Sequence, residues 1–270
     1  MGPSPDEGGL FTTLDDDHDM TASSSLLSAA PTASDPVDHA DVLRAQLPAL
    51  RLLLGEDAFE PLVALAVQHS DAQGVPPESP TGVPALHFVH GLIVHGDVPV
   101  PDGVPPRLLA DVAALEAAVA EVHALAPRAQ HEPRLPLAEL QALPPADRDR
   151  AVLRPARALR IVPVAFRLAG WLRDVHEGRM PHPPRLGEQY VAVYALPGLL
   201  SAHDETPVTW WHGLPAPEGR LLARLALGIP LGELRAEAAT RGWIATDEEL
   251  DTWLAGWVRE GLFAELATGG

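Results

Sequence analysis

The segment Val208-Thr209-Trp210-Trp211-His212 decides the fold class, because the hydrophobic pattern changes from strand-like to helical soon after it. Its β-branched and aromatic residues are typical of a β-strand. Helical stretches follow at about 218–227, from Pro230 onward, and from Thr246, which forms a capping box with Glu249. Strands followed by three short helices are the element order of a winged-helix-like domain.

Two more strands are predicted before this segment. Leu159-Arg160-Ile161-Val162 is typical of a strand and continues through Pro163 into a helix. Gln189-Tyr190-Val191-Ala192-Val193-Tyr194 has the composition and alternation of another strand. The apolar face of the intervening helix consists of Leu168, Trp171, Leu172 and Val175. Residues 151–270 are therefore predicted to form a small sheet that carries three helices.

Residues 38–150 are predicted to form a helical bundle. Leucines at positions i, i+4, i+7 and i+11 predict one helix that ends at Gly55; they are Leu43, Leu47, Leu50 and Leu54. Further helices are predicted over about 59–66, 83–94 and 105–122, with a short one near 137–143. We therefore expect a mainly α protein with a small β-sheet (α+β), in which a helical bundle precedes a winged-helix-like domain.

The first 37 residues differ from the rest of the chain. Residues 1–37 carry seven acidic side chains and no basic one. Such a segment buries too little apolar surface to offset the entropy lost on ordering. We predict a disordered acidic tail.

The composition excludes several classes of protein. The formal net charge is −18, from 37 acidic residues and 19 basic residues that are all arginine, and there is no cysteine. The missing cysteine and lysine exclude disulfides, thiolate metal sites, thiol nucleophiles and lysine Schiff bases. A chain this acidic repels phosphate backbones, so no nucleic-acid partner is expected. Without a long apolar run or a recognisable secretory signal, we expect a cytoplasmic protein with no membrane partner.

No combination of residues predicts catalysis or metal binding. His87, His90 and His95 share one predicted helix, but no carboxylate lies at ligand spacing from them. The sequence also lacks a nucleophile elbow, a zinc-protease motif, a P-loop and a dinucleotide-binding glycine motif. We predict no catalytic residue, no metal ligand and no cofactor in this chain.

Aromatic residues indicate a candidate peptide-binding surface. Tyr190 and Tyr194 lie on one face of their strand, whereas the adjacent Trp210 and Trp211 face opposite sides of theirs. A short aromatic sheet with an open edge can accept a peptide as an extra strand. The predicted peptide-binding residues are Tyr190, Val191, Ala192, Val193, Tyr194, Trp210 and Trp211. The alternative is that both strands are simply buried against the helices.

Three arginines form a candidate partner interface. Arg154, Arg157 and Arg160 recur every third residue and make an island of positive charge in an acidic chain. They are predicted to contact an acidic peptide or a protein partner. The alternative is a solvated or internally paired run.

Several segments resemble the HvfC/BufC-type proteins. Leu47–Phe59 resembles their helix-turn-helix with the pattern P-x-x-x-x-L-x-G-E-x-x-F, and Leu108–Glu116 resembles their Y-L-A-D-V-A-R-L-E helix. Leu159–Val164 followed by Trp171 resembles their strand-to-helix unit, and Trp257–Gly261 resembles their closing segment. The likeness extends over about residues 38–266.

The resemblance implies a non-catalytic partner protein. HvfC/BufC-type proteins act beside a multinuclear non-haem iron-dependent oxidative enzyme that modifies a ribosomal precursor peptide. The C-terminal domain would be a peptide recognition domain that holds the precursor's leader as an added strand. The helical half would dock on the enzyme as a heterodimer, and the iron would belong to that enzyme.

Two alternatives remain at the level of sequence. One is a winged-helix-like DNA-binding regulator, against which stand the net charge and the acidic residues of the last predicted helix. The other is a stand-alone metalloenzyme that uses the histidines.

Overall fold

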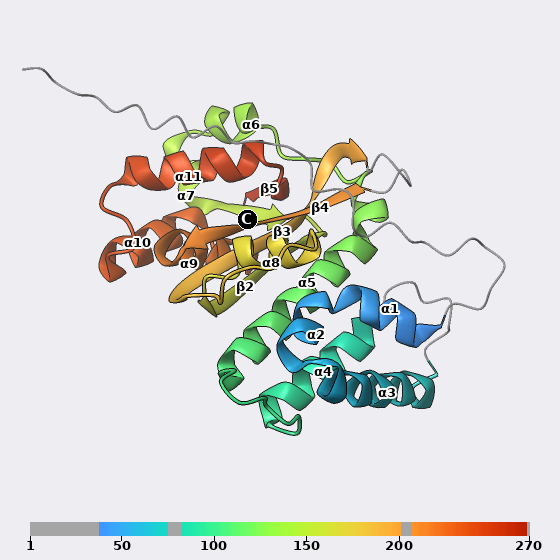
Figure 1. Cartoon of the computed structure of the whole chain (residues 1–270). Helices are drawn as coiled ribbons and strands as arrows, with labels where there is room; N and C mark the ends of the chain where they lie inside the picture. Colours follow the sequence, from blue (N-terminus) through green and yellow to red (C-terminus); the bar gives the residue numbers. More distant parts are fainter. Residues whose placement is uncertain (1–37, 75–82, 201–206, 269–270) are drawn as a thin grey trace, which may run out of the picture.

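The computed structural model describes residues 38–74, 83–200 and 207–268, so the tail predicted over residues 1–37 lies outside the described residues. It confirms a mainly α protein with small antiparallel β-sheets (Figure 1). The elements in chain order are α1 (His39–Gln46), α2 (Pro48–Leu54), α3 (Glu56–Ala72), α4 (Val83–His95), α5 (Pro106–Ala129), α6 (Leu137–Ala142), α7 (Pro145–Arg150), β1 (Ala151–Pro155), β2 (Leu159–Phe166), α8 (Ala169–His176), β3 (Leu186–Leu200), β4 (Pro207–Pro215), α9 (Ala216–Ala226), α10 (Leu231–Arg241), α11 (Asp247–Arg259) and β5 (Phe263–Thr268).

The prediction of a single first helix from the leucine pattern is wrong, because the helix is interrupted between α1 and α2. Leu47 has φ −122° and ψ 43°, outside the helical region. Pro48 follows it, and a proline both lacks an N–H and disfavours helical geometry in the residue before it. The end predicted at Gly55 is confirmed, and this glycine has φ 72°. The four leucines still face one core, because both short helices turn their apolar sides inward.

Two antiparallel sheets are present in the described residues. The larger has the strand order β2-β3-β4, so β3 is its central strand, and the smaller pairs β1 with β5. Strands β1 and β5 were not expected from the sequence pattern. Both strands are short, and they pair with each other from opposite ends of the C-terminal half, with Leu153 opposite Leu266.

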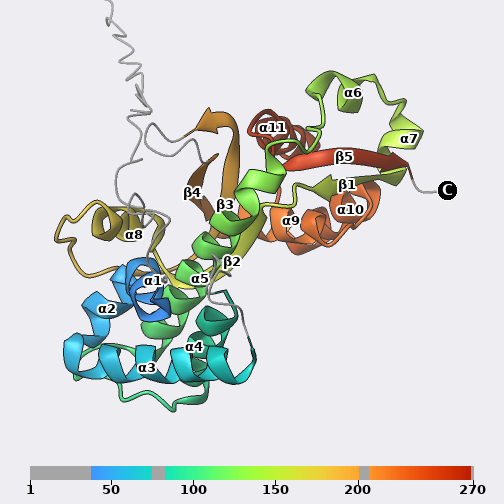
Figure 2. The ribbon, with the colours of Figure 1, turned by 90° about the vertical axis from the view of Figure 1, so that its right-hand side faces the viewer.

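The larger sheet separates two hydrophobic cores. One face packs on α1–α5 and α8 through Val191 and Val193, and the other packs on α9–α11 through Ala192 and Tyr194. Figures 1 and 2 show the sheet between these two groups of helices, with α5 crossing one side of it. The domain boundary predicted at residue 150 stays a prediction, and hydrophobic packing crosses it.

Helix α5 carries two buried carboxylates into the first core. Glu116 is fully buried, and its oxygens accept the backbone N–H groups of Ala49 at 2.7 Å and Leu50 at 3.1 Å. Asp111 accepts the N–H of Ala165 at 2.6 Å. Glu116 therefore caps the start of α2, whose own preceding residue offers no capping side chain.

Candidate peptide-binding site

The predicted peptide-binding residues 190–194 do not lie on an open edge, because their strand, β3, is paired on both sides. Val191 lies opposite Val162 of β2 and opposite Gly213 of β4. Val191, Ala192 and Val193 are fully buried. The central position of β3 results from pairing with two segments that are distant in sequence. The alternation of residues within β3 does not encode this pairing. The backbone of β3 is therefore not available to an added peptide strand.

Strand β4 has an outer edge, meaning the side that faces away from β3. Nη2 of Arg173 on α8 donates to the carbonyl oxygen of Trp211 at 3.2 Å, so this carbonyl points outward. In an antiparallel pair, successive residues alternate between turning both backbone groups toward the partner strand and away from it. The outward residues of β4 are therefore Thr209, Trp211 and Gly213. Within residues 38–74, 83–200 and 207–268, no hydrogen bond engages the N–H groups of Thr209 and Gly213.

The other edge of this sheet, on β2, is interrupted for strand pairing. The same alternation places Pro163 among the outward residues, where its missing N–H is tolerated. The N–H of Ala165 is taken by Asp111 at 2.6 Å. The guanidinium of Arg160 donates to the carbonyl of Leu159 at 2.8 Å. Among the described residues, β2 thus keeps one outward N–H without a hydrogen bond, that of Ile161, whereas β4 keeps those of both Thr209 and Gly213.

The two adjacent tryptophans of β4 face opposite sides, as predicted. Trp211 lies on the first core, and its indole N–H donates to the carbonyl of Ala169 at 3.2 Å. Trp210 lies on the second core and is only partly buried. The guanidinium of Arg173 is 5.0 Å from the Trp210 ring centroid. Arg173 thus wraps around the edge, from the Trp210 ring on one face to the Trp211 carbonyl.

Titratable groups surround this edge. Tyr194 donates its hydroxyl to Glu260 at 3.3 Å and meets the His212 ring edge-on at 5.8 Å between centroids. Burial, together with the Glu260 carboxylate, raises the pKa of Tyr194 well above its usual range. Burial lowers the pKa of His212, and the positive charge of Arg173 lowers it further while Glu260 opposes both. At neutral pH the edge therefore presents an uncharged imidazole beside one arginine.

In the predicted arginine island, two of the three guanidinium groups are paired with carboxylates. Arg154 pairs with Glu265, which lies opposite it in the β1–β5 sheet, and Arg160 pairs with Glu121 of α5. The backbone N–H of Arg157 donates to a carboxylate of Glu132 at 2.9 Å. The use of these residues as a partner interface stays a prediction.

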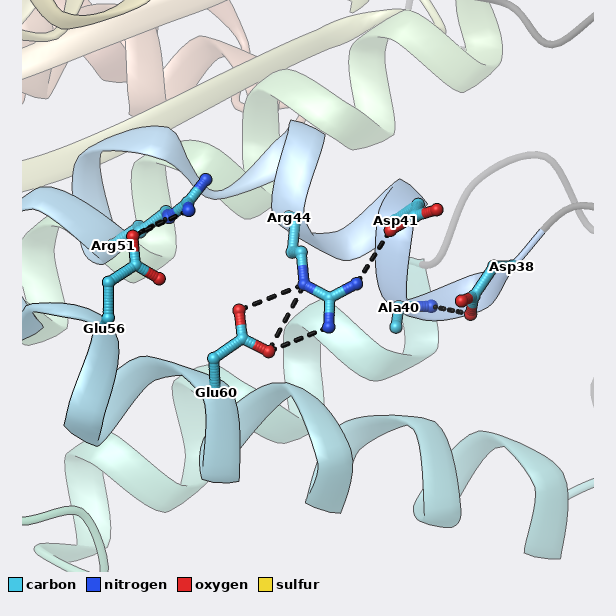
Figure 3. Close-up of polar contacts among 7 residues, drawn as sticks. All are labelled: Asp38, Ala40, Asp41, Arg44, Arg51, Glu56 and Glu60. Atoms are coloured by element: carbon cyan, nitrogen blue, oxygen red, sulfur yellow. Dashed lines mark hydrogen bonds and ion pairs between the residues drawn. The ribbon is translucent and has the colours of Figure 1, made fainter.

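Arginines of the helical half are paired in the same way. Arg44 reaches from α1 to Glu60 of α3 at 2.8 Å and to Asp41 at 2.7 Å, and Arg51 reaches Glu56 at 2.6 Å (Figure 3). The Arg44–Glu60 pair joins α1 to α3, the Arg51–Glu56 pair joins α2 to α3, and the Arg44–Asp41 pair lies within α1.

Two of the histidines of α4 lie beside a carboxylate or in a partly buried setting. His87 lies 2.5 Å from Glu121, and burial lowers the pKa of His90. Throughout the described ranges, no group of three or more histidine or carboxylate side chains is placed to hold a metal ion. No helix among the described residues has the length and hydropathy to cross a bilayer.

Sequence reasoning missed four members of the site. Arg173, Thr209, His212 and Glu260 meet at β4 only through tertiary structure. Alternation along 208–212 could have placed Thr209 with Trp211 on one face. Neither the comparison with known protein families nor the search of curated proteins found a match for this chain.

Proposed function

We propose that this chain is a non-catalytic partner protein that binds a ribosomal precursor peptide along the outer edge of β4. It presents that peptide to a multinuclear non-haem iron-dependent oxidative enzyme in the cytoplasm, as the resemblance to HvfC/BufC-type proteins implies. Iron and chemistry belong to the enzyme. Holding the leader raises the effective concentration of the residue to be modified at the enzyme's site.

The observation that carries the proposal is the open edge of β4. Its outward N–H groups at Thr209 and Gly213 can donate to the carbonyls of an added strand. Trp210 and Trp211 stand on the two faces beside this edge and offer aromatic area to alternate side chains of the peptide. Backbone bonds thus supply affinity, and the flanking side chains supply register.

The test replaces one outward donor. Thr209→Pro removes an outward N–H but leaves the ladder to β3 intact, because the N–H of this residue does not serve that ladder. The proline ring also stands in the path of an incoming strand, so we expect affinity for the precursor peptide encoded beside this gene to fall at least tenfold. Binding is measured by fluorescence anisotropy with a labelled peptide.

The matched control is Thr209→Val, which keeps the N–H and removes only the hydroxyl. The hydroxyl oxygen is buried without a hydrogen-bond partner, so this variant should fold and bind as the parent does. Equal peptide affinity of Thr209→Pro and Thr209→Val would exclude strand addition at β4.

Complex formation with the enzyme is a separate measurement. We expect the chain and the co-encoded iron enzyme to co-elute in size-exclusion chromatography. Independent elution at micromolar concentration contradicts the partner role. Turnover of any substrate by the isolated chain contradicts the non-catalytic assignment.

A further inference from the structure

A small apolar pocket lies away from β4, between α6, α7, α10 and α11. Its volume is about 230 Å³, and none of its lining residues belongs to β3, β4 or α8. The lining residues are Leu137, Leu140, Gln141, Arg148, Leu231, Asp251, Leu254 and Ala255. Four leucines and an alanine thus surround one arginine and one aspartate.

Arg148 has few close partners for a partly buried guanidinium. Its side chain is 32% exposed, and the nearest carboxylate, on Asp251, is 4.0 Å away. Its Nη2 lies 3.5 Å from the carbonyl of Gln141, and its Nε is buried with no hydrogen-bond partner. By contrast, Arg224 meets Glu237 at 2.8 Å. A partly buried cation that lacks close acceptors carries a desolvation cost that a bound anion would offset.

Asp251 is not a dedicated acceptor for Arg148, because a second arginine also contacts this carboxylate. Arg235 of α10 lies 3.4 Å from Asp251 and 3.3 Å from Asp247. Two guanidinium groups therefore compete for the Asp251 carboxylate, and Arg235 is the closer of them. Arg148 therefore lines the pocket beside its leucines without a close carboxylate of its own.

The pocket's size limits what it can hold. An apolar cavity of about 150 Å³ is large enough for benzene, so about 230 Å³ holds a group somewhat larger. A branched chain of about six carbons, including its carboxyl group, matches this volume. The apolar lining excludes a ligand that is polar along its length.

We propose that this pocket binds a carboxylate at the end of a branched apolar chain, about six carbons in all. The apolar group lies against Leu137, Leu140, Leu231 and Leu254, and the carboxylate accepts from Arg148. Both a free branched-chain acid and the carboxyl terminus of a peptide that ends in leucine carry this chemistry. The site does not depend on peptide binding at β4.

The test uses 4-methylpentanoate and its neutral analogue 4-methylpentanamide with the full chain. Binding is followed by chemical-shift changes in ¹H–¹⁵N correlation spectra. We expect the acid to bind with a Kd on the order of 1 mM, as its few atoms allow, and the amide to bind at least tenfold more weakly. Equal binding of acid and amide overturns the assignment to Arg148, and no binding of either overturns the site.

Two variants locate the contacts. Arg148→Met keeps the apolar stem and should weaken acid binding at least tenfold, while Arg150→Met makes the same change on an exposed position of α7 and should leave it unchanged. Ala255→Phe fills the pocket and should abolish binding. Acid binding that survives Ala255→Phe in a folded protein shows that the acid binds elsewhere and overturns the proposal.

The source of the carboxylate is separated by a second probe. Acetyl-Gly-Gly-Leu with a free carboxyl terminus is compared with its amidated form and with 4-methylpentanoate. Tighter binding of the free-terminus peptide assigns the pocket to a peptide end, and tighter binding of the acid assigns it to a small metabolite. Each of these outcomes supports the shared chemistry.

Discussion

Removal of the buried charge at Glu116 should change how stability depends on pH. Glu116 is fully buried in the first core and accepts the N–H groups of Ala49 and Leu50 at the start of α2. Glu116→Gln keeps the shape of the side chain and one acceptor oxygen but cannot ionise. Its amide NH2 replaces the other acceptor, so one of the two backbone hydrogen bonds is lost at every pH. The pH dependence of the difference between the variant and the parent therefore isolates the energetic effect of the proton.

The expected magnitude follows from the raised pKa of this carboxyl. Burial raises the pKa of Glu116 from 4.5 to about 8, against the two backbone hydrogen bonds that lower it. The folded chain therefore binds this proton more tightly than the unfolded chain. The contribution of Glu116 to the free energy of unfolding is therefore largest at low pH, and it falls by ~1.4 kcal/mol per pH unit as the pH rises from about 4.5 to about 8. Between about pH 5 and pH 8 the loss amounts to ~3.5 kcal/mol.

The assay is urea unfolding followed by far-ultraviolet circular dichroism at several pH values. From about pH 5 to pH 8 the parent should lose ~3.5 kcal/mol of unfolding free energy relative to Glu116→Gln. Glu139→Gln, which changes an exposed glutamate of α6, should run parallel to the parent. If the curves of Glu116→Gln and the parent are also parallel, Glu116 titrates normally and its burial has been misjudged.

Two further predictions concern the C-terminal half. Gly219→Ala would place a Cβ 2.2 Å from the Cβ of Tyr190, so we expect the free energy of unfolding in chemical denaturation to fall by ~2–3 kcal/mol. The control is Gly256→Ala, which has no atom within 4 Å of the new Cβ and should be neutral or slightly stabilising. An equal effect of both variants would contradict the close α9–β3 contact. Arg173→Met should raise the pKa of His212, because burial lowers it and the guanidinium charge lowers it further; an unchanged imidazole titration by ¹H NMR would place Arg173 away from this ring.

Local patterns predicted most elements correctly. The strands that contain residues 159–162, 189–194 and 208–212 are present, as are the three C-terminal helices and the capping box in which Thr246 accepts the N–H of Glu249. Each of these signals lies within a few residues of sequence. Patterns of this kind report which face of an element is apolar and where it begins or ends.

Strand order was not predictable from the same patterns. Residues 189–194 alternate as a half-buried strand does, yet pairing with both β2 and β4 makes this strand central. An edge strand would tolerate Val191→Pro. In the central strand β3 this change replaces a fully buried side chain, so we expect it to prevent folding. Arg154 and Arg160 were likewise visible as charges, whereas their partners Glu265 and Glu121 lie 111 and 39 residues away.

The position of β4 explains how one strand can serve both parts of the proposed function. Trp211 belongs to the core shared with the helical half, and Trp210 belongs to the core shared with α9–α11. A peptide added to the outer edge of β4 would contact side chains from both cores at once. Because α8 is tied to this edge through Arg173 and through the Trp211–Ala169 hydrogen bond, an enzyme docked on the helical half would lie next to the elements that hold the peptide. Arg173→Met tests the link between α8 and the β4 edge. If the variant folds but the peptide loses its register, α8 couples the helical half to peptide binding.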